Sequence, residues 1–246
     1  MIARRYRLAA VLGACIALGA TGALAQDISV SFGQGAGLTE RVLQLIALIT
    51  VLSLAPSILV MVTSFTRIVV VLSLLRTALG TATAPPNAVI ISLAMFLTAF
   101  VMWPTFTTAY DAGIRPLVAN EITPEQAFER ASDPFRAFML KNVREKDLKL
   151  FIDLSGQPPP DKPEDMSLRV LVPSFMISEL KRAFEIGFLM FLPFLIIDLV
   201  VASVLMSMGM MMLPPVVVSL PFKLIFFVLV DGWSLVAGSL IQSYGT

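Results

Sequence analysis

Residues 186–206 read IGFLMFLPFLIIDLVVASVLM, a run in which Asp198 is the only charged residue and Pro193 the only proline. A helix that crosses a lipid bilayer needs about 20 consecutive, predominantly apolar residues, and this run meets that requirement. Three more apolar stretches lie elsewhere in the chain, at Val42–Leu75, Ala88–Phe106 and Val216–Leu240. The pattern predicts an all-α membrane protein with four hydrophobic helical segments.

The composition supports a membrane protein and argues against an enzyme. Apolar residues make up 57% of the chain and charged residues 14%, whereas soluble proteins carry about 25% charged residues. The net charge of +1 gives no reason to expect nucleic acid as a partner. The chain has no histidine, and its single cysteine, Cys15, lies near the start. Because the commonest general base and metal ligand is missing, we expect no catalytic activity, cofactor or metal.

The first residues have the features of a secretory signal. Arg4, Arg5 and Arg7 precede a short stretch rich in alanine and glycine, and residues 23–25 (ALA) form a cleavage site of the A-x-A type. We therefore expect residues 1–25 to be a cleavable signal peptide and Gln26 to start the mature chain outside the cytoplasm. Residues 26–41 would be a flexible extracytoplasmic terminus. The alternative is an uncleaved first transmembrane helix.

Prolines divide the apolar stretches into two predicted hairpins. Val42–Leu75 is too long for one straight crossing and contains Pro56, which predicts either a helix bent near this proline or two helical pieces. A turn at Pro85–Pro86 then leads into the second stretch, so residues 42–110 form the first hairpin. Residues 186–246 form the second hairpin, with a methionine-rich loop between its arms.

Residues 111–185 differ in kind, because they hold most of the charged residues of the chain. Thr123-Pro124-Glu125-Gln126 predicts a helix start with a capping threonine. Further helices are expected from Asp133–Pro134 and from near Pro173, and the charged run Arg144–Asp147 is typical of a solvated helical face. These residues would form a small extracytoplasmic, periplasmic helical domain.

The charges near the membrane give the orientation. Four crossings from an external N-terminus place residues 111–185 outside and two short connections inside. Those connections carry Arg67, Arg76 and Lys223 and no acidic residue, as the positive-inside rule expects.

Ionisable residues within apolar segments are costly unless they are paired or hydrated. Asp198 and Lys223 lie at similar distances from the loop between their two segments, which places them at nearly the same depth. They are candidate partners within one hairpin or between neighbouring subunits; alternatively, Lys223 extends to the membrane surface. Asp231 lies about 12 Å further along the axis and needs another partner. Arg67 is the fourth charge of this kind.

The loop of the second hairpin is rich in methionine, with Met206, Met208, Met210, Met211 and Met212 close together. Ordinary apolar filling is one interpretation. Methionine is also unbranched and adaptable, so a ring of such loops could close around variable cargo and still exclude ions.

Several long runs carry a resemblance that covers about Leu43–Ser243. They include residues 63–72 (TSFTRIVVVL), 85–87 (PPN), 134–140 (PFRAFML), 200–215 (VVASVLMSMGMMMLPP), 219–223 (SLPFK) and 227–233 (FVLVDGW). With these runs the chain resembles the FliP family of flagellar export proteins. The resemblance implies a pore-forming subunit that assembles, in several copies, with FliQ-type and FliR-type proteins and conducts unfolded flagellar proteins across the inner membrane at the flagellar basal body.

The resemblance also implies roles for single residues. Met208 and Met210–Met212 match the gasket that closes the pore, and Glu179, Asp198 and Lys223 match positions expected at subunit contacts. Two other readings stay open, the homologous export-gate subunit of a virulence-type injectisome and a secondary transporter of a small solute. The cleavable signal and the Asp-Gly-Trp run resemble the flagellar branch more.

Overall fold

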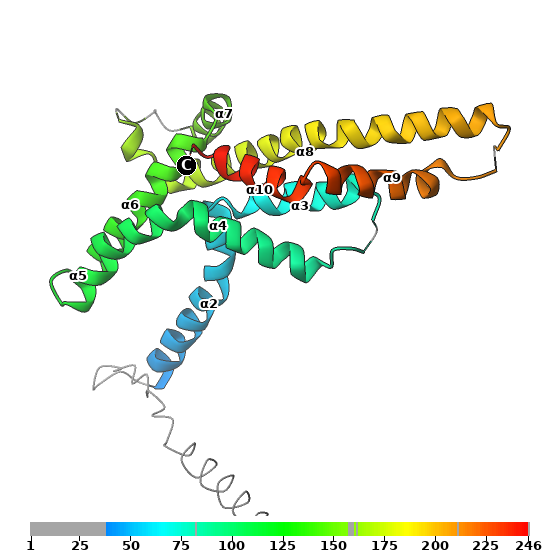
Figure 1. Cartoon of the computed structure of the whole chain (residues 1–246). Helices are drawn as coiled ribbons and strands as arrows, with labels where there is room; N and C mark the ends of the chain where they lie inside the picture. Colours follow the sequence, from blue (N-terminus) through cyan, green and yellow to red (C-terminus); the bar gives the residue numbers. More distant parts are fainter. Residues whose placement is uncertain (1–37, 82, 157–159, 161, 211, 246) are drawn as a thin grey trace, which may run out of the picture. The chain divides into compact units, whose positions relative to one another are not determined.

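The computed structural model describes residues 38–81, 83–156, 160, 162–210 and 212–245 (Figure 1). Every regular element within these residues is a helix, so an all-α fold is confirmed for them. The elements are α2 (Leu38–Val62), α3 (Phe65–Ala78), α4 (Asn87–Ala109), a π-helical turn (Tyr110–Ile114), α5 (Arg115–Val118), α6 (Pro124–Asn142), α7 (Glu145–Ser155), a 3-10 turn (Pro163–Asp165), α8 (Leu168–Ser207), α9 (Pro215–Leu229) and α10 (Gly232–Gln242). The predicted signal peptide lies outside the described residues.

Among the described residues, length and apolar composition mark three helical stretches as able to cross a membrane. They are Leu45–Val62 in α2, Asn87–Val118 and Leu168–Ser207, and the bent pair α9–α10 would make a fourth. The chain divides into two compact units between Val51 and Leu52. The second unit holds the end of α2 and every helix from α3 to α10.

The sequence predicts the first break near Pro56. In the structure the break begins at Thr63, seven residues later. Helix α2 includes Pro56 and ends at Val62, and α3 begins at Phe65. Two threonine side chains stabilise the break between α2 and α3. The Thr63 hydroxyl accepts a hydrogen bond from the Phe65 amide at 3.4 Å, and the Thr66 hydroxyl donates to the Val60 carbonyl at 3.3 Å. Such threonine bonds compete with the helical ladder, and Pro56 lies inside α2 without ending it. Of the two alternatives, two helical pieces is therefore correct.

Helix α3 is the centre of the fold. Half of its side chains are buried, at Thr66, Arg67, Ile68, Val71, Leu72, Leu75 and Ala78. Its apolar side chains pack against α4, against α8 through Ala183 and Phe194, and against α10 through Leu240. A Cβ at Gly187 of α8 would lie 2.3 Å from Leu74 Cδ1, so this glycine permits the close approach of α8 to α3.

The helical run that begins with α4 continues beyond the predicted end of the first hairpin at residue 110. Its chain runs through Pro104 into the π-helical turn and then into α5, ending at Val118. The turn packs closely on α6, since a Cβ at Gly113 would lie 2.6 Å from the Ala127 carbonyl oxygen.

Helix α6 begins as the sequence predicts and then differs from it. Thr123 and Gln126 form a capping box at its start. The predicted second helix from Asp133–Pro134 is wrong, because α6 runs without a break from Pro124 to Asn142. The carbonyl that Pro134 leaves without a helical donor belongs to Arg130, which is exposed, so water can satisfy it.

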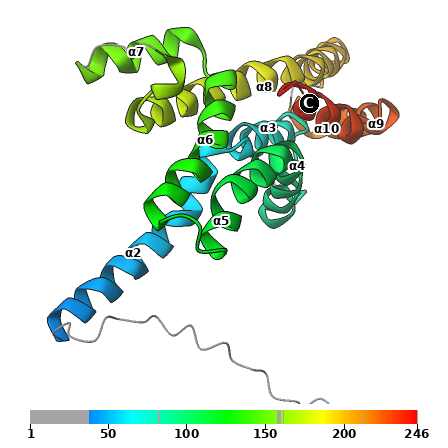
Figure 2. The same cartoon turned by 90° about the vertical axis from the view of Figure 1, so that its left-hand side faces the viewer.

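Helix α8 is 40 residues long and begins earlier than predicted. It starts at Leu168, where the Ser167 hydroxyl accepts from the Arg169 amide, and runs through Pro173 and Pro193 to Ser207. The predicted boundary between residues 185 and 186 therefore lies inside one helix. Its first part packs with α6 and α7 around Met139, Leu171 and Phe175 (Figure 2).

The last apolar segment is two helices instead of one. Helices α9 and α10 meet at a 63° bend. At the bend Asp231 takes the left-handed conformation, with φ of 50°, a region that aspartate tolerates better than most residues. Gly232 follows directly under the Phe227 ring, where a Cβ would lie 2.2 Å from a ring carbon.

Candidate functional site: two buried ion pairs and a methionine loop

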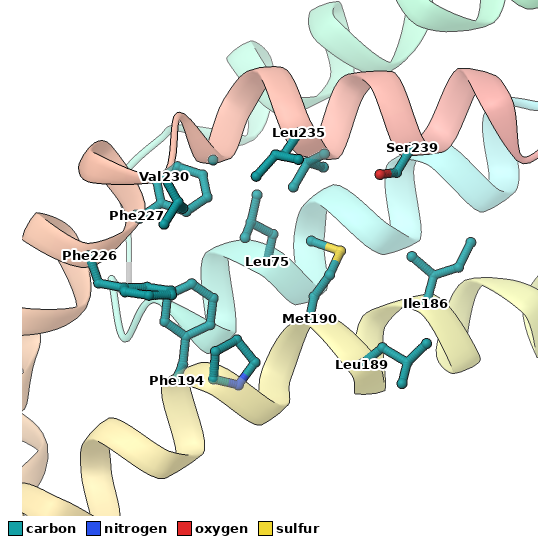
Figure 3. Close-up of a pocket in the computed structure, with 13 residues that line it drawn as sticks. Leu75, Ile186, Leu189, Met190, Phe194, Phe226, Phe227, Val230, Leu235 and Ser239 are labelled. Atoms are coloured by element: carbon teal, nitrogen blue, oxygen red, sulfur yellow. The ribbon is translucent and has the colours of Figure 1, made fainter.

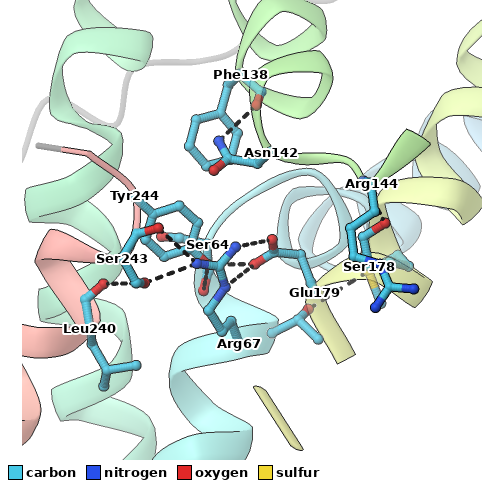
Figure 4. Close-up of polar contacts among 12 residues, drawn as sticks. Ser64, Arg67, Phe138, Asn142, Arg144, Ser178, Glu179, Leu240, Ser243 and Tyr244 are labelled. Carbon is cyan, nitrogen blue, oxygen red and sulfur yellow. Dashed lines mark hydrogen bonds and ion pairs between the residues drawn. The ribbon is translucent and has the colours of Figure 1, made fainter. Parts of the chain in front are cut away.

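Arg67 of α3 and Glu179 of α8 form a fully buried ion pair. Arg67 Nε donates to Glu179 Oε2 at 2.9 Å, and the neighbouring Nη2 donates to Oε1 (Figure 4). Two parallel bonds between a guanidinium and a carboxylate make a strong, directional contact. The sequence singled out both residues but did not pair them.

Ser243 and Tyr244 complete the surroundings of this pair. Arg67 Nη1 donates to Ser243 Oγ at 2.9 Å and to the Ser243 carbonyl oxygen at 3.2 Å. The Tyr244 hydroxyl donates to Glu179 Oε2, with the Ser64 carbonyl oxygen 3.3 Å away as an alternative acceptor. The Arg67 guanidinium carbon also lies 3.8 Å from the centre of the Tyr244 ring. The buried charges are therefore satisfied by hydrogen bonds and a cation–π contact.

Tyr244 acts in this cluster as a neutral donor. Burial raises the pKa of the Tyr244 hydroxyl well above its usual range, and the negative charge of Glu179 raises it further. The proton therefore stays on the tyrosine. Sequence reasoning missed both Ser243 and Tyr244, because their positions after the last apolar segment carry no local signal of a partner on α3 or α8.

A second polar cluster ties α7 to α8. The Ser178 hydroxyl donates to Asp147 Oδ2 at 2.7 Å and accepts from the Arg144 amide at 3.1 Å. Arg144 Nε lies 3.1 Å from the same Asp147 oxygen. The interpretation of Arg144–Asp147 as a solvated charged run is wrong for Asp147, which is buried and is part of a contact between helices.

Asp198 and Lys223 join the two arms of the second hairpin. Lys223 Nζ lies 2.7 Å from Asp198 Oδ2 and donates to the Ala78 carbonyl oxygen at 3.2 Å. The Ser219 hydroxyl donates to Asp198 Oδ1. The pair forms within one chain, and Lys223 is only 3% exposed, so it does not extend to the surface. Its ammonium group also meets a carbonyl at the end of α3, where a positive charge is favourable.

Asp231 does not join these pairs. It is exposed at the bend between α9 and α10, and its left-handed backbone gives it a conformational role. The partner that the sequence predicts for its carboxylate stays a prediction.

The methionine loop lies at the tip of the α8–α9 hairpin, which extends beyond α3 and α4 (Figure 1). Helix α8 ends in a Schellman motif, with the Gly209 amide bonded to Met206 O at 3.1 Å and the Met210 amide to Leu205 O at 3.0 Å. Gly209 supplies the left-handed residue that this motif needs, with φ of 75°.

The methionine side chains of the loop are exposed. The exposed fractions are 65% for Met208, 40% for Met210 and 99% for Met212. Met211 lies outside the described residues. An apolar filler would be covered by its own chain, so these side chains are available to contact something else.

Within the described part of the chain, no group of three or more acidic, cysteine or histidine side chains gathers where it could hold a metal ion. Long apolar helices, an interior in which charges are paired, and an uncovered apolar hairpin define the class: an all-α integral membrane protein.

Comparison with known proteins gives the family. Residues 48–240 match the FliP family. The flagellar biosynthetic protein FliP of Caulobacter vibrioides is 62% identical over 243 residues, which cover 98% of this chain and 91% of that protein. The proteins of the same name from Rhizobium meliloti and Bacillus subtilis are 54% and 55% identical over 82% of this chain, covering 84% and 91% of their own lengths. The chain belongs to the FliP family.

Proposed function

We propose that this protein is a pore-forming, non-catalytic subunit of the flagellar type III export gate. Several copies would assemble with FliQ-type and FliR-type proteins in the bacterial inner membrane, within the flagellar basal body. The assembly conducts unfolded flagellar proteins out of the cytoplasm. The mature N-terminus and residues 111–185 face the periplasm.

The observation that carries this proposal is the exposed methionine loop at the tip of an apolar hairpin. Met208, Met210 and Met212 are exposed in a loop that no other described part of the chain covers. Adaptable thioether side chains suit a constriction that must close on itself and also accept many different polypeptides. We assign Met208 and Met210–Met212 to this gasket.

The sides of the same hairpin support an assembly. A groove of about 570 Å³ runs between α8 and α9, and its lining is apolar from Ile196 to Leu229. Many side chains along both helices are exposed, among them Val200, Val204, Phe222 and Ile225. Both lipid and neighbouring protein can cover such a surface.

The irregular backbone favours protein as the main neighbour. Helices α9 and α10 bend by 63° within an apolar segment, and Asp231 is exposed at the bend. Free backbone groups and charges are tolerated at membrane depth where protein or water surrounds them, and not where lipid does. Neighbouring subunits would provide those surroundings, and Asp231 would then face one of them.

The two buried ion pairs prepare each subunit for assembly. Asp198–Lys223 fixes the two arms of the hairpin to each other and to the end of α3. Arg67–Glu179 fixes α3 to α8. Rigid subunits lose less conformational freedom on association, which favours a defined complex.

The names of the relatives favour the flagellar system over a virulence-type injectisome. The three relatives compared above are all called flagellar biosynthetic proteins. A partnership with needle components instead of flagellar ones would reverse this choice.

Native mass spectrometry tests the proposal. The full-length gene is co-expressed with the FliQ-type and FliR-type genes, and the complex is purified in mild detergent. We expect one discrete complex that contains several copies of this chain together with both partners. A monomer or simple dimer that excludes both partners would contradict the proposed function.

A further inference from the structure

Helix α10 packs on the rest of the fold through one apolar side, and Trp233, Ser234, Leu235, Ser239 and Gln242 are exposed. Of its eleven residues, Gly232 and Leu240 are buried, while the others are exposed or half-buried. Leu240 reaches the core of Ile68, Val71 and Leu72 on α3. Half-buried Val236 packs against the same core and against the cluster around Leu75 and Phe194, and the Trp233 ring meets Phe227 of α9 edge to face.

The residues directly after α10 add polar contacts to this apolar packing. Ser243 accepts both hydrogen bonds of Arg67 Nη1, and the Tyr244 hydroxyl donates to Glu179. The Tyr244 ring stacks on Phe138 of α6, with ring centres 5.8 Å apart, and is 3% exposed. Two residues thus connect α10 to α3, α6 and α8 at one point (Figure 4).

The other end of α10 has the geometry of a hinge. Val230 and Asp231 separate it from α9, and Asp231 is already in a sparsely populated backbone region. Residues at the ends of elements are the usual places where a rotation is absorbed. A helix with a hinge at one end and a polar anchor at the other can move as a unit.

A pocket lies under this helix. It has a volume of about 520 Å³, and α10 contributes Leu235, Val236 and Ser239 to its wall (Figure 3). The opposite wall comes from α8, including Met190 and Phe194. The pocket is already open to the outside, and movement of α10 away from the core would widen it.

We propose that Ser243 and Tyr244 form a latch that holds α10 over the pocket, anchored on the Arg67–Glu179 pair. When the latch opens, α10 swings on the Val230–Asp231 turn while α3 and α8 stay packed. Both latch residues lie beyond residues 48–240, the part that matches the family. The proposal concerns movement within one chain and does not depend on the proposed pore.

Hydrogen exchange of the full chain in detergent, read by mass spectrometry, tests the latch. The variant Tyr244→Phe keeps the ring and removes the hydroxyl that bonds Glu179. The matched control is Tyr110→Phe, the same change at an exposed tyrosine of the π-helical turn.

The expected result is local. Amides of Gly232–Gln242 should exchange about tenfold faster or more in Tyr244→Phe, because a hydrogen bond to a charged group corresponds to at least that factor. Amides of Phe65–Ala78 in α3 should be unchanged, and Tyr110→Phe should behave as the parent protein. Unchanged exchange in α10 would overturn the latch. Equal acceleration of α3 and α10 would overturn it as well, because Tyr244 would then stabilise the whole fold and not hold one movable helix.

Discussion

Asp198 Oδ2 and Lys223 Nζ lie 2.7 Å apart across the α8–α9 hairpin, and the same ammonium group bonds the Ala78 carbonyl at the end of α3. One buried charge thus fixes three helices. The hairpin that carries the methionine loop is thereby attached to the central helix of the fold.

Removing one partner of this pair should be costly. We expect Lys223→Met to reduce the free energy of unfolding by about 2–3 kcal/mol, because it leaves the half-buried Asp198 carboxylate with the Ser219 hydroxyl and without its cationic partner. Denaturant titration in mild detergent measures this. Lys181→Met is the control, since Lys181 pairs with Glu185 at the surface and its loss should cost less than about 1 kcal/mol.

A double-mutant cycle distinguishes a coupled pair from two independent sites. In Asp198→Asn/Lys223→Met the loss should be clearly smaller than the sum of the two single losses. Additive losses would show that the pair contributes no coupling.

Gly113→Ala should destabilise the contact between the π-helical turn and α6. The new Cβ would lie 2.6 Å from the Ala127 carbonyl oxygen, a backbone atom that cannot rotate away. We expect a loss of about 1–3 kcal/mol by the same titration. Gly238→Ala is the matched control, because a Cβ there meets no atom within 4 Å. Equal stability of the two variants would mean that this close approach is not rigid.

The α7–α8 contact depends on Ser178. Ser178→Ala removes a donor to Asp147 and an acceptor for the Arg144 amide, both in a buried place. A buried group left unsatisfied costs about 1–3 kcal/mol. The sharper readout is hydrogen exchange, in which amides of Glu145–Ser155 should exchange faster while those of α3 should not. Unchanged exchange of the α7 amides would mean that apolar side chains, and not Ser178, stabilise the contact between α7 and α8.

The predicted signal peptide gives a direct mass difference. Intact-mass measurement on protein purified from bacterial membranes should show a chain that starts at Gln26. A chain that retains residues 1–25 would support an uncleaved first helix and would change the predicted orientation.

Local sequence signals predict the helical class, the apolar segments and the start of α6 correctly. They place element boundaries less well where a proline occurs. Local rules expect Pro56, Pro134 and Pro173 each to bend, break or start a helix, and each lies inside one. A proline removes one hydrogen bond, and tertiary packing or water compensates for that loss in ways that a local pattern does not contain.

Of the polar contacts, one could be predicted from the sequence and another could not. Asp198 and Lys223 are predictable because both lie in one hairpin, at matching distances from its loop. The contact of Tyr244 with Glu179 joins residues 65 positions apart in sequence. Such a contact depends on how α10 and α8 are arranged in space, and the sequence offers no periodicity that fixes this arrangement.

Ion leakage shows most directly whether the methionine loop seals a pore. Complexes containing Met210→Ala/Met211→Ala/Met212→Ala are reconstituted into liposomes with the partner proteins and compared with the parent complex. Met95→Ala, at an exposed methionine of α4, is the control for a lost methionine elsewhere. We predict intact assembly in both variants, and a clear rise in ion conductance for the loop variant alone. Assembled loop-variant complexes that hold ions as well as the parent would contradict the proposed gasket.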